Sequence, residues 1–343
     1  MHMSLELTQF TQRMPKVELH VHLEGSILPQ TLLELTRRNH IHLPGEDETG
    51  LNGLYQFHDF DQFLQSYLTI TSCLRTPEDY QLIAYEYGRE CFRQNIRYAE
   101  VTFTVLTNTT LTGLTWQEVL QGLNAGRAQA QQEFGVSWQW VFDIVRNLPE
   151  SQAEVLDIAL AAREMGVVAL GLGGLENGYP PELFTETFGR AESRHLHRVP
   201  HAGEIAGPES VWSALNLLHA ERIGHGVHSI EDPNLVEYLH IHSIPLEVCP
   251  TSNICLRVYQ DYAQHPLRKL WEAGVLLTIG SDDPPMFGTD LNHEYQVLVN
   301  EFGFTRSELE RISLNGIQAS FLSPEEKQKL AGEFKEDFAK LAQ

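Results

Sequence analysis

The sequence is poor in basic residues. Lys and Arg total 24 against 46 Asp and Glu, which gives a formal net charge of -22. A protein that binds nucleic acid or an anionic membrane needs a basic face, and no cluster of Lys or Arg occurs in the chain. We therefore expect neither nucleic acid nor a membrane surface as a partner, and we interpret the acidity as that of a soluble surface.

Cysteine and long apolar runs are also scarce. The four cysteines are widely spaced and form no CxxC motif, which predicts free thiols in a reducing cytoplasm. No window approaches 18 uncharged apolar residues, so no transmembrane helix is expected. The N-terminus has no basic segment followed by an apolar core, as a secretory signal would have. The predicted location is cytoplasmic.

Short apolar runs bounded by turn residues recur along the 343 residues, and helical patterns lie between them. Eight strands that alternate with helices predict a (β/α)₈ TIM barrel, and a barrel of this kind can take up residues 1–343 as a single domain. The strands are expected at 17–22, 97–103, 139–145, 166–172, 198–203, 221–226, 244–249 and 275–281.

Two segments exceed a minimal barrel. The stretch 23–96 is far longer than one helix needs, and we expect it to form a helical lid over the barrel mouth. Its aromatic residues, with Phe63 and Tyr67 as the candidates, could wall a substrate pocket or could only pack the insertion onto the barrel. Residues after about 290 predict C-terminal helices, with N-caps at Thr305 and Ser323.

Polar side chains stand where four of the predicted strands end. In a barrel these ends meet at the active-site mouth, and buried His and Asp cost free energy unless they are paired or bind a metal. Four such strand ends in one barrel therefore predict a metal site. The segments are His20-Val21-His22, His201-Ala202-Gly203-Glu204, Gly224-His225-Gly226-Val227-His228 and Ser281-Asp282-Asp283-Pro284.

Zinc suits a set of imidazole and carboxylate ligands. His20, His22, His201 and Asp282 can supply them from three strands. No lysine ends a central strand, where a carbamylated lysine could bridge two metals, so we expect one Zn²⁺ per subunit.

The remaining polar residues are assigned from their positions. Zinc lowers the pKa of a bound water towards 7, and His225 is placed to orient that water and take its proton. Glu204 could protonate the substrate, and Asp283 should point away from Asp282, towards the substrate. The expected chemistry is hydrolysis of an amide, an ester or an amidine-like ring carbon.

Five motifs, taken together, resemble the adenosine deaminase family of the amidohydrolase superfamily. They are PKVELHVHLEGS, HAGE, RIGHGVHSIEDP, LEVCPTSN and SDDPPMFGT, in family order. The resemblance implies a zinc-dependent removal of the 6-amino group of a purine as ammonia. It implies the same four zinc ligands, Glu204 as the proton donor, His225 as the water-orienting histidine and Asp283 as a purine contact.

The departures from the family concern the substrate. Gly174 fits a glycine that contacts the purine, but Gly171 and Leu175 stand where the family often has acids. Glu24 replaces an aspartate expected near the ribose. We expect a purine nucleoside substrate, adenosine or deoxyadenosine. The alternatives are 6-aminodeoxyfutalosine, an intermediate of menaquinone biosynthesis, or adenine.

Two further hypotheses assign the protein to other functional classes. A different hydrolase on the same scaffold would bind zinc without purine turnover. A non-catalytic binding protein would normally have lost a ligand or the acid. A homo-oligomer is compatible with the sequence.

Overall fold

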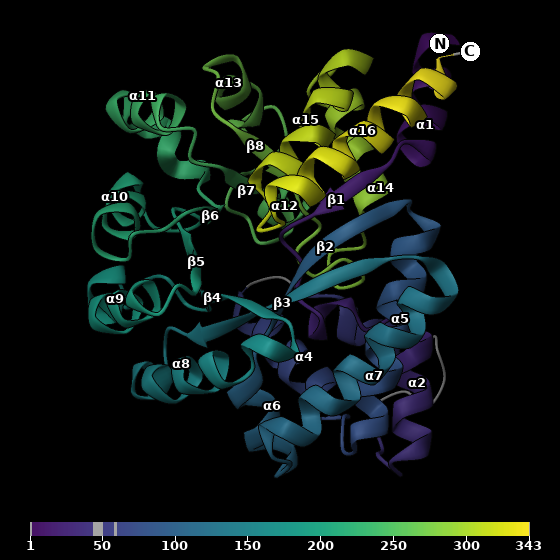
Figure 1. Cartoon of the computed structure of the whole chain (residues 1–343), viewed down its shortest axis with the longest axis vertical. Helices are drawn as coiled ribbons and strands as arrows, with labels where there is room; N and C mark the ends of the chain where they lie inside the picture. The colour runs from purple at the N-terminus through teal and green to yellow at the C-terminus, as the bar shows by residue number, and fades with distance from the viewer. Residues whose placement is uncertain (1, 44–50, 58–59, 343) are drawn as a thin grey trace.

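The computed structural model describes residues 2–43, 51–57 and 60–342. Eight parallel strands pair in chain order from β1 to β8, and helices surround them (Figure 1). This confirms the predicted (β/α)₈ barrel. The strands are β1 Lys16–Glu18, β2 Ile96–Phe103, β3 Ser137–Val145, β4 Val167–Gly173, β5 His197–Ala202, β6 Ile223–His225, β7 Leu246–Val248 and β8 Leu277–Ile279.

Strands β6, β7 and β8 have 3 residues each, fewer than predicted, because their regular ladders end before the apolar runs do. The first strand is also shorter than predicted. Its regular ladder ends at Glu18, and beyond it Val21 pairs singly with Asp282 while His22 pairs singly with Thr102. The amide of His22 donates to the carbonyl of Asp282 at 2.8 Å, and the amide of Asp282 donates to the carbonyl of His20 at 3.1 Å. The segment after β1 therefore joins the end of β8 to the barrel, at the point where both carry polar side chains.

Helices follow the strands and form the outer layer (Figure 1). Those between consecutive strands from β2 to β8 are α6 Val105–Thr112, α7 Trp116–Phe134, α8 Gln152–Ala161, α9 Thr185–Ser193, α10 Pro208–Leu217, α11 Pro233–Ile241, α12 Pro250–Cys255 and α13 Leu267–Glu272. The short 3₁₀ turns are η1 Glu24–Ser26, η2 Asn52–Tyr55, η3 Pro149–Ser151, η4 Arg163–Met165, η5 Pro181–Phe184 and η6 Val227–Glu231.

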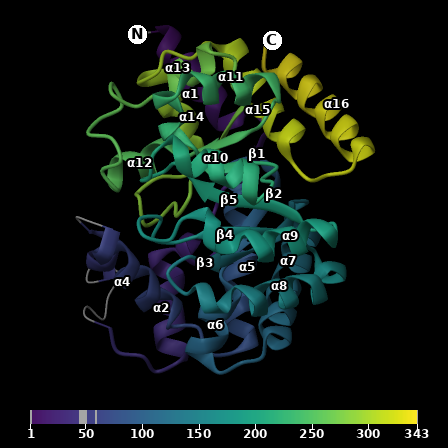
Figure 2. The same cartoon turned by 90° about the vertical axis from the view of Figure 1, so that its left-hand side faces the viewer.

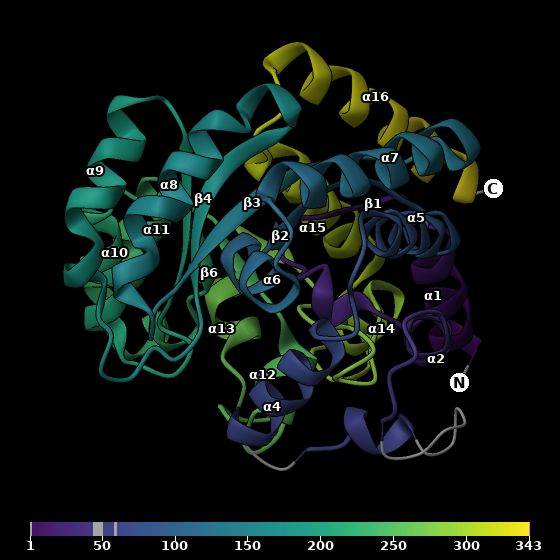
Figure 3. The same ribbon diagram turned by 90° about the horizontal axis from the view of Figure 1, so that it is seen from below.

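The long insertion after β1 is helical, as predicted. It holds α2 Pro29–Arg38, α4 Phe60–Thr71 and α5 Pro77–Arg93, and Thr76 caps α5 in a capping box with Asp79. Helix α4 contacts the 3₁₀ turn η1 that follows β1, and it lies on the same side of the molecule as α12 (Figures 2 and 3). The Phe63 ring stacks on Phe287 with centroids 5.3 Å apart, so aromatic contact joins the insertion to the segment after β8.

The ends of the chain add helices outside the barrel. They are α1 His2–Arg13, α14 Leu291–Asn300, α15 Arg306–Ala319 and α16 Pro324–Leu341. Thr305 and Ser323 cap α15 and α16 in capping boxes, which confirms both predicted starts. All four cysteines are free thiols, as expected. Within the part of the chain that the structure describes, no helix is long and apolar enough to cross a membrane.

Candidate active site

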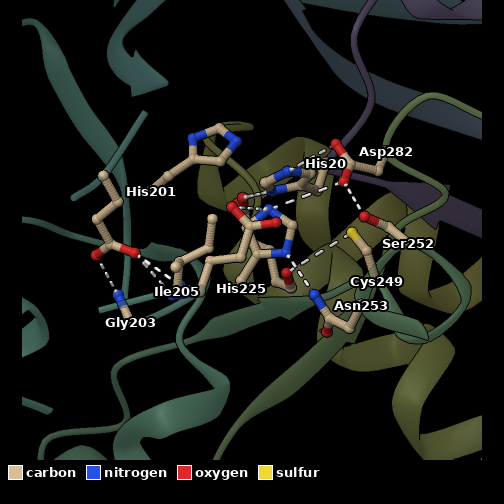
Figure 4. Close-up of polar contacts among 12 residues, drawn as sticks. His20, His201, Gly203, Ile205, His225, Cys249, Ser252, Asn253 and Asp282 are labelled. Carbon is tan, nitrogen blue, oxygen red and sulfur yellow. Dashed lines mark hydrogen bonds and ion pairs between the residues drawn. The ribbon is translucent and has the colours of Figure 1, made fainter. Parts of the chain in front are cut away.

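The barrel brings three imidazoles and one carboxylate together at its mouth. One ligand atom from each of His20, His22, His201 and Asp282 lies within 4.8 Å of the other three. Figure 4 shows His20, His201 and Asp282 of this set. His201 comes from β5, His20 and His22 follow β1, and Asp282 follows β8. The four residues predicted as a ligand set thus form one cluster.

The protonation of the cluster fits a metal ion. Burial lowers the pKa of His22 to about 4 and that of His201 well below its usual value, so both rings are neutral and offer lone pairs. Burial also disfavours a charge on His20, but the nearby carboxylates of Asp282 and Glu247 outweigh it and raise the pKa of His20 to about 10. These carboxylates are stabilised by a positive charge in the cluster, and a metal cation would supply that charge.

The hydrogen bonding of the rings supports the same conclusion. Glu247 Oε2 lies 3.0 Å from Nδ1 of His20, which leaves Nε2 facing Asp282 at 3.5 Å. His20 Nε2 and His201 Nδ1 are buried and have no hydrogen-bond partner among the described residues. A second set, with His225 and Cys249 in place of His22 and His201, meets the same distance limit, so thiol sulfur also lies near the cluster.

Glu204 and His225 lie beside the cluster and face each other. His225 Nε2 is 3.7 Å from Glu204 Oε2 and 3.9 Å from Asp282 Oδ2. Burial raises the pKa of Glu204 to about 8, with the charges of Asp282 and Glu176 adding to the effect. Its carboxyl group therefore keeps a proton at neutral pH, as a general acid requires.

A chain of hydrogen bonds determines which nitrogen of His225 carries the proton. The amide of Leu267 donates to His265 Nδ1 at 3.2 Å, His265 Nε2 lies 3.0 Å from Asn253 Oδ1, and Asn253 Nδ2 lies 3.4 Å from His225 Nδ1. A backbone amide only donates, so His265 accepts at Nδ1 and donates from Nε2 to Asn253 Oδ1. Asn253 Nδ2 then donates to His225 Nδ1, and neutral His225 therefore holds its proton on Nε2. Burial and the neighbouring His20 lower the pKa of His225 to about 3. Neutral His225 thus presents its Nε2–H towards Glu204 and Asp282, and its predicted role in taking a proton from water stays a prediction.

Two of these residues adopt a strained backbone. His225 has φ 58° and Asp282 has φ 64°, in the left-handed region that few non-glycine residues occupy. Such strain persists where the surrounding structure enforces it, and it collects at functional sites.

The predicted substrate contacts divide into two groups. Gly174, Phe63, Tyr67 and Asp283 line one cavity, and three members of the cluster line it too: His22, His201 and Asp282. Glu24 is not among the described residues that line it. Its Oε1 instead accepts the amide of Thr104 at 3.0 Å and the side chain of Asn108 at 2.6 Å, which places it behind the cavity wall.

Several residues that hold the site were not singled out in the sequence. Glu247 orients His20, and Ser252 donates to Asp282 Oδ2 at 2.6 Å. Arg146 donates to the carbonyl of His201. The available signal was a charged residue inside an apolar strand, as in Leu246-Glu247-Val248, because such a residue is buried only with a partner.

Glu247→Gln is expected to weaken metal binding about 10–100-fold, the usual cost of losing a partner of a ligand histidine. The amide cannot serve both His20 and Arg222, which Glu247 contacts in the structure. A chelator competition titration measures the affinity, and excess zinc should restore activity. Glu237→Gln, on the exposed face of α11, is the matched control. An unchanged affinity for Glu247→Gln contradicts the expectation.

Comparison with known proteins agrees with this geometry. The family model described as adenosine deaminase matches residues 15–337. An aminodeoxyfutalosine deaminase from Streptomyces avermitilis is 42% identical over 331 residues, which cover 96% of this chain and 92% of the relative.

Two solved structures share the fold closely. An adenine deaminase from Arthrobacter aurescens is 33% identical, with a TM-score of 0.90 over 94% of this chain and 98% of the other. An amidohydrolase from Burkholderia ambifaria, solved with bound Zn, is 26% identical, with a TM-score of 0.91 over 98% of this chain and 93% of the other. The chain is a hydrolytic aminohydrolase and belongs to the adenosine deaminase family of the amidohydrolase superfamily.

Proposed function

We propose that this protein hydrolyses the 6-amino group of aminodeoxyfutalosine and releases ammonia. This was an alternative in the sequence analysis, where adenosine was the first expectation. Aminodeoxyfutalosine is an adenine nucleoside whose 5′ carbon carries an arm that ends in a benzoate. The observation that carries the proposal is the extent of the cavity at the metal-ligand cluster, and the 42% identity to an aminodeoxyfutalosine deaminase supports it.

The cavity has a volume of about 640 Å³. Sites for drug-sized ligands span about 300–1,000 Å³, so the space exceeds what a bare purine ring needs. From the cluster it extends between α4, α6 and the start of α8. Apolar side chains from these elements can cover an aromatic arm; they are Phe60, Leu64, Leu68, Leu106, Leu111, Leu148 and Val155.

The charge of the cavity wall disfavours a nucleotide. Of the described residues that line the cavity, none is Lys or Arg, whereas Glu150 and Glu154 are acidic. A phosphate group is usually held by Arg, Lys or a helix N-terminus. The benzoate of the proposed substrate carries one negative charge, fewer than the roughly 1.5–2 of a phosphate monoester. Thr107, Thr110 and Asn147 offer it neutral hydrogen-bond donors.

The proposed chemistry assigns one task to each residue of the site. His20, His22, His201 and Asp282 would hold a divalent metal ion, which makes hydroxide available from water near neutral pH. Glu204 donates its proton to the purine ring nitrogen next to C6 as the water oxygen bonds to C6. The Nε2–H of His225 orients the attacking oxygen, and Asp283 accepts a hydrogen bond from the purine. Collapse of the tetrahedral carbon then breaks the bond between C6 and the amino nitrogen. One proton of the attacking water completes the leaving ammonia, and the other restores the proton of Glu204.

A parallel assay of four compounds tests the substrate. Aminodeoxyfutalosine is expected to exceed adenosine and adenine in kcat/KM by about 10–100-fold, since burial of an aromatic group contributes about 1.5–3 kcal/mol. AMP should be a poor substrate. Ultraviolet absorbance follows the conversion of the 6-aminopurine, and ammonia release is the check. Preference for adenine or adenosine would replace the proposed substrate. If the protein with bound metal converted none of the four compounds, the proposed deamination would be overturned.

The pH dependence of kcat/KM should report the proton on Glu204. A proton donor is active below its pKa and inactive above it, so kcat/KM is expected to fall as pH rises through about 8. Initial rates across buffers from mildly acidic to alkaline measure the profile. A rate that stays constant well above that pH contradicts the role of Glu204 as the acid.

A further inference from the structure

The carboxylate of Glu176 holds the backbone that carries Glu204. Glu176 follows β4 and is buried, with 5% of its surface exposed. Its Oε1 accepts the amide of Gly203 at 2.7 Å, and its Oε2 accepts the amides of Glu204 at 3.2 Å, Ile205 at 2.9 Å and Ala206 at 3.0 Å. Figure 4 shows the bonds at Gly203 and Ile205. One side chain thus satisfies four consecutive backbone donors.

The Glu176 carboxylate also accepts a hydrogen bond from helix α10. Ser210, in the first turn of α10, donates its hydroxyl to Glu176 Oε1 at 2.5 Å. Glu176 is ionised because Arg146, Ser210 and the loop amides outweigh the effect of burial and lower its pKa. Buried amides around an anion form a strong charge-assisted arrangement. The segment 203–206 is therefore held by a group from a different strand.

Among the described residues, Glu176 is the hydrogen-bond acceptor found for the backbone amide of Glu204. Its amide is in the middle of the row bound by Glu176, while its carboxyl group extends to within 3.7 Å of His225. Gly203 adopts φ 67° and a Cβ there would lie 2.4 Å from Val211, so the turn between His201 and Glu204 is tight. The position of the Glu204 carboxyl group thus depends on the path of this turn.

We propose that Glu176 is a positioning residue for the deamination, acting by fastening the 203–206 backbone so that Glu204 reaches the substrate. The proposal rests on the proposed role of Glu204. A misplacement of about 1 Å in a reacting group can cost about 100-fold in rate. Loss of a supporting residue outside the direct contacts typically costs about 10–100-fold.

Glu176→Gln tests the proposal, because an amide cannot accept hydrogen bonds at both of its terminal atoms. We expect kcat to fall about 10–100-fold with KM changed less than about threefold. Hydrogen exchange followed by mass spectrometry, on the metal-free protein, should show the amides of 203–206 exchanging about tenfold faster. Glu182→Gln, an exposed carboxylate on η5, is the matched control and should change neither quantity.

A double variant separates positioning from an independent effect. If Glu176 acts through Glu204, then Glu176→Gln should not slow the Glu204→Gln protein further. The proposal would be overturned if the two kcat losses multiplied in the double variant. It would also be overturned if Glu176→Gln left amide exchange at 203–206 unchanged, or if exchange became faster while kcat stayed the same. If Glu204→Gln is fully active, the role of Glu204 fails, while the exchange experiment still tests the backbone contact. Glu176→Asp, which keeps the charge, should give intermediate exchange and serves if the amide variant does not fold.

Discussion

Glu204→Gln should lower kcat by about 10²–10⁴-fold, the range that a positioned general acid contributes. The variant keeps the shape of the side chain but removes the proton that the proposed reaction needs. Because the Glu204 carboxyl is not in the cluster of His20, His22, His201 and Asp282, metal content should remain that of the parent protein. Steady-state deamination and metal analysis on the same preparation measure both quantities.

Glu209→Gln is the control for this variant. Glu209 lies on α10, five positions further along the chain, and its side chain is exposed. The same chemical change there should leave kcat within about twofold, as surface substitutions usually do. A kcat for Glu204→Gln within about threefold of the parent would show that the proton comes from another group.

Arg222→Met should destabilise the fold by about 3–5 kcal/mol, the cost of removing one partner of a buried ion pair. Arg222 is 1% exposed, and its guanidinium lies 2.6 Å from Glu100 Oε2 and 2.5 Å from Glu247 Oε1. Without it, the two buried carboxylates of Glu100 and Glu247 lack their cation. Glu247 also supports His20, so metal affinity should fall in the same variant.

Urea unfolding of the metal-free protein measures this loss without a contribution from bound metal. Arg190→Met is the matched control, because Arg190 is 46% exposed and pairs with the exposed Asp157. That surface pair should contribute at most about 1 kcal/mol. Arg222→Lys keeps the charge but loses the planar guanidinium group that can bond to both carboxylates. We therefore expect it to lower the free energy of unfolding by less than Arg222→Met does. Equal stability of Arg222→Met and the parent would show that the triad makes no net contribution.

The positions of the strands could be predicted because each is a short apolar run with turn residues at its ends. The ladder of β1 was expected to continue to residue 22, yet it ends at Glu18. Pairing of Val21 with Asp282 and of His22 with Thr102 breaks the regular register, and such long-range pairing leaves no local signal in the sequence. The function of the insertion as a lid stays a prediction, while its helices and its position at the cavity are observed.

The metal-ligand cluster could be anticipated for a specific reason. Barrel strands all deliver their C-terminal ends to one mouth, so His20, His201 and Asp282 were predicted to meet from their positions along the chain. The contacts that support them could not be found in this way. Glu176 bonds to residues 203–206, and Glu247 to His20, across separations that no local pattern records.

By itself the sequence determined the strand order, the donor types at the barrel mouth and the family motifs, because these depend on residue identity and on periodicity along the chain. The tertiary structure decided which nitrogen of His225 carries the proton and why Glu204 keeps its own. It also decided how far the cavity extends beyond a purine ring. These properties arise from burial and from hydrogen bonds between distant segments, and neither exists until the chain has folded.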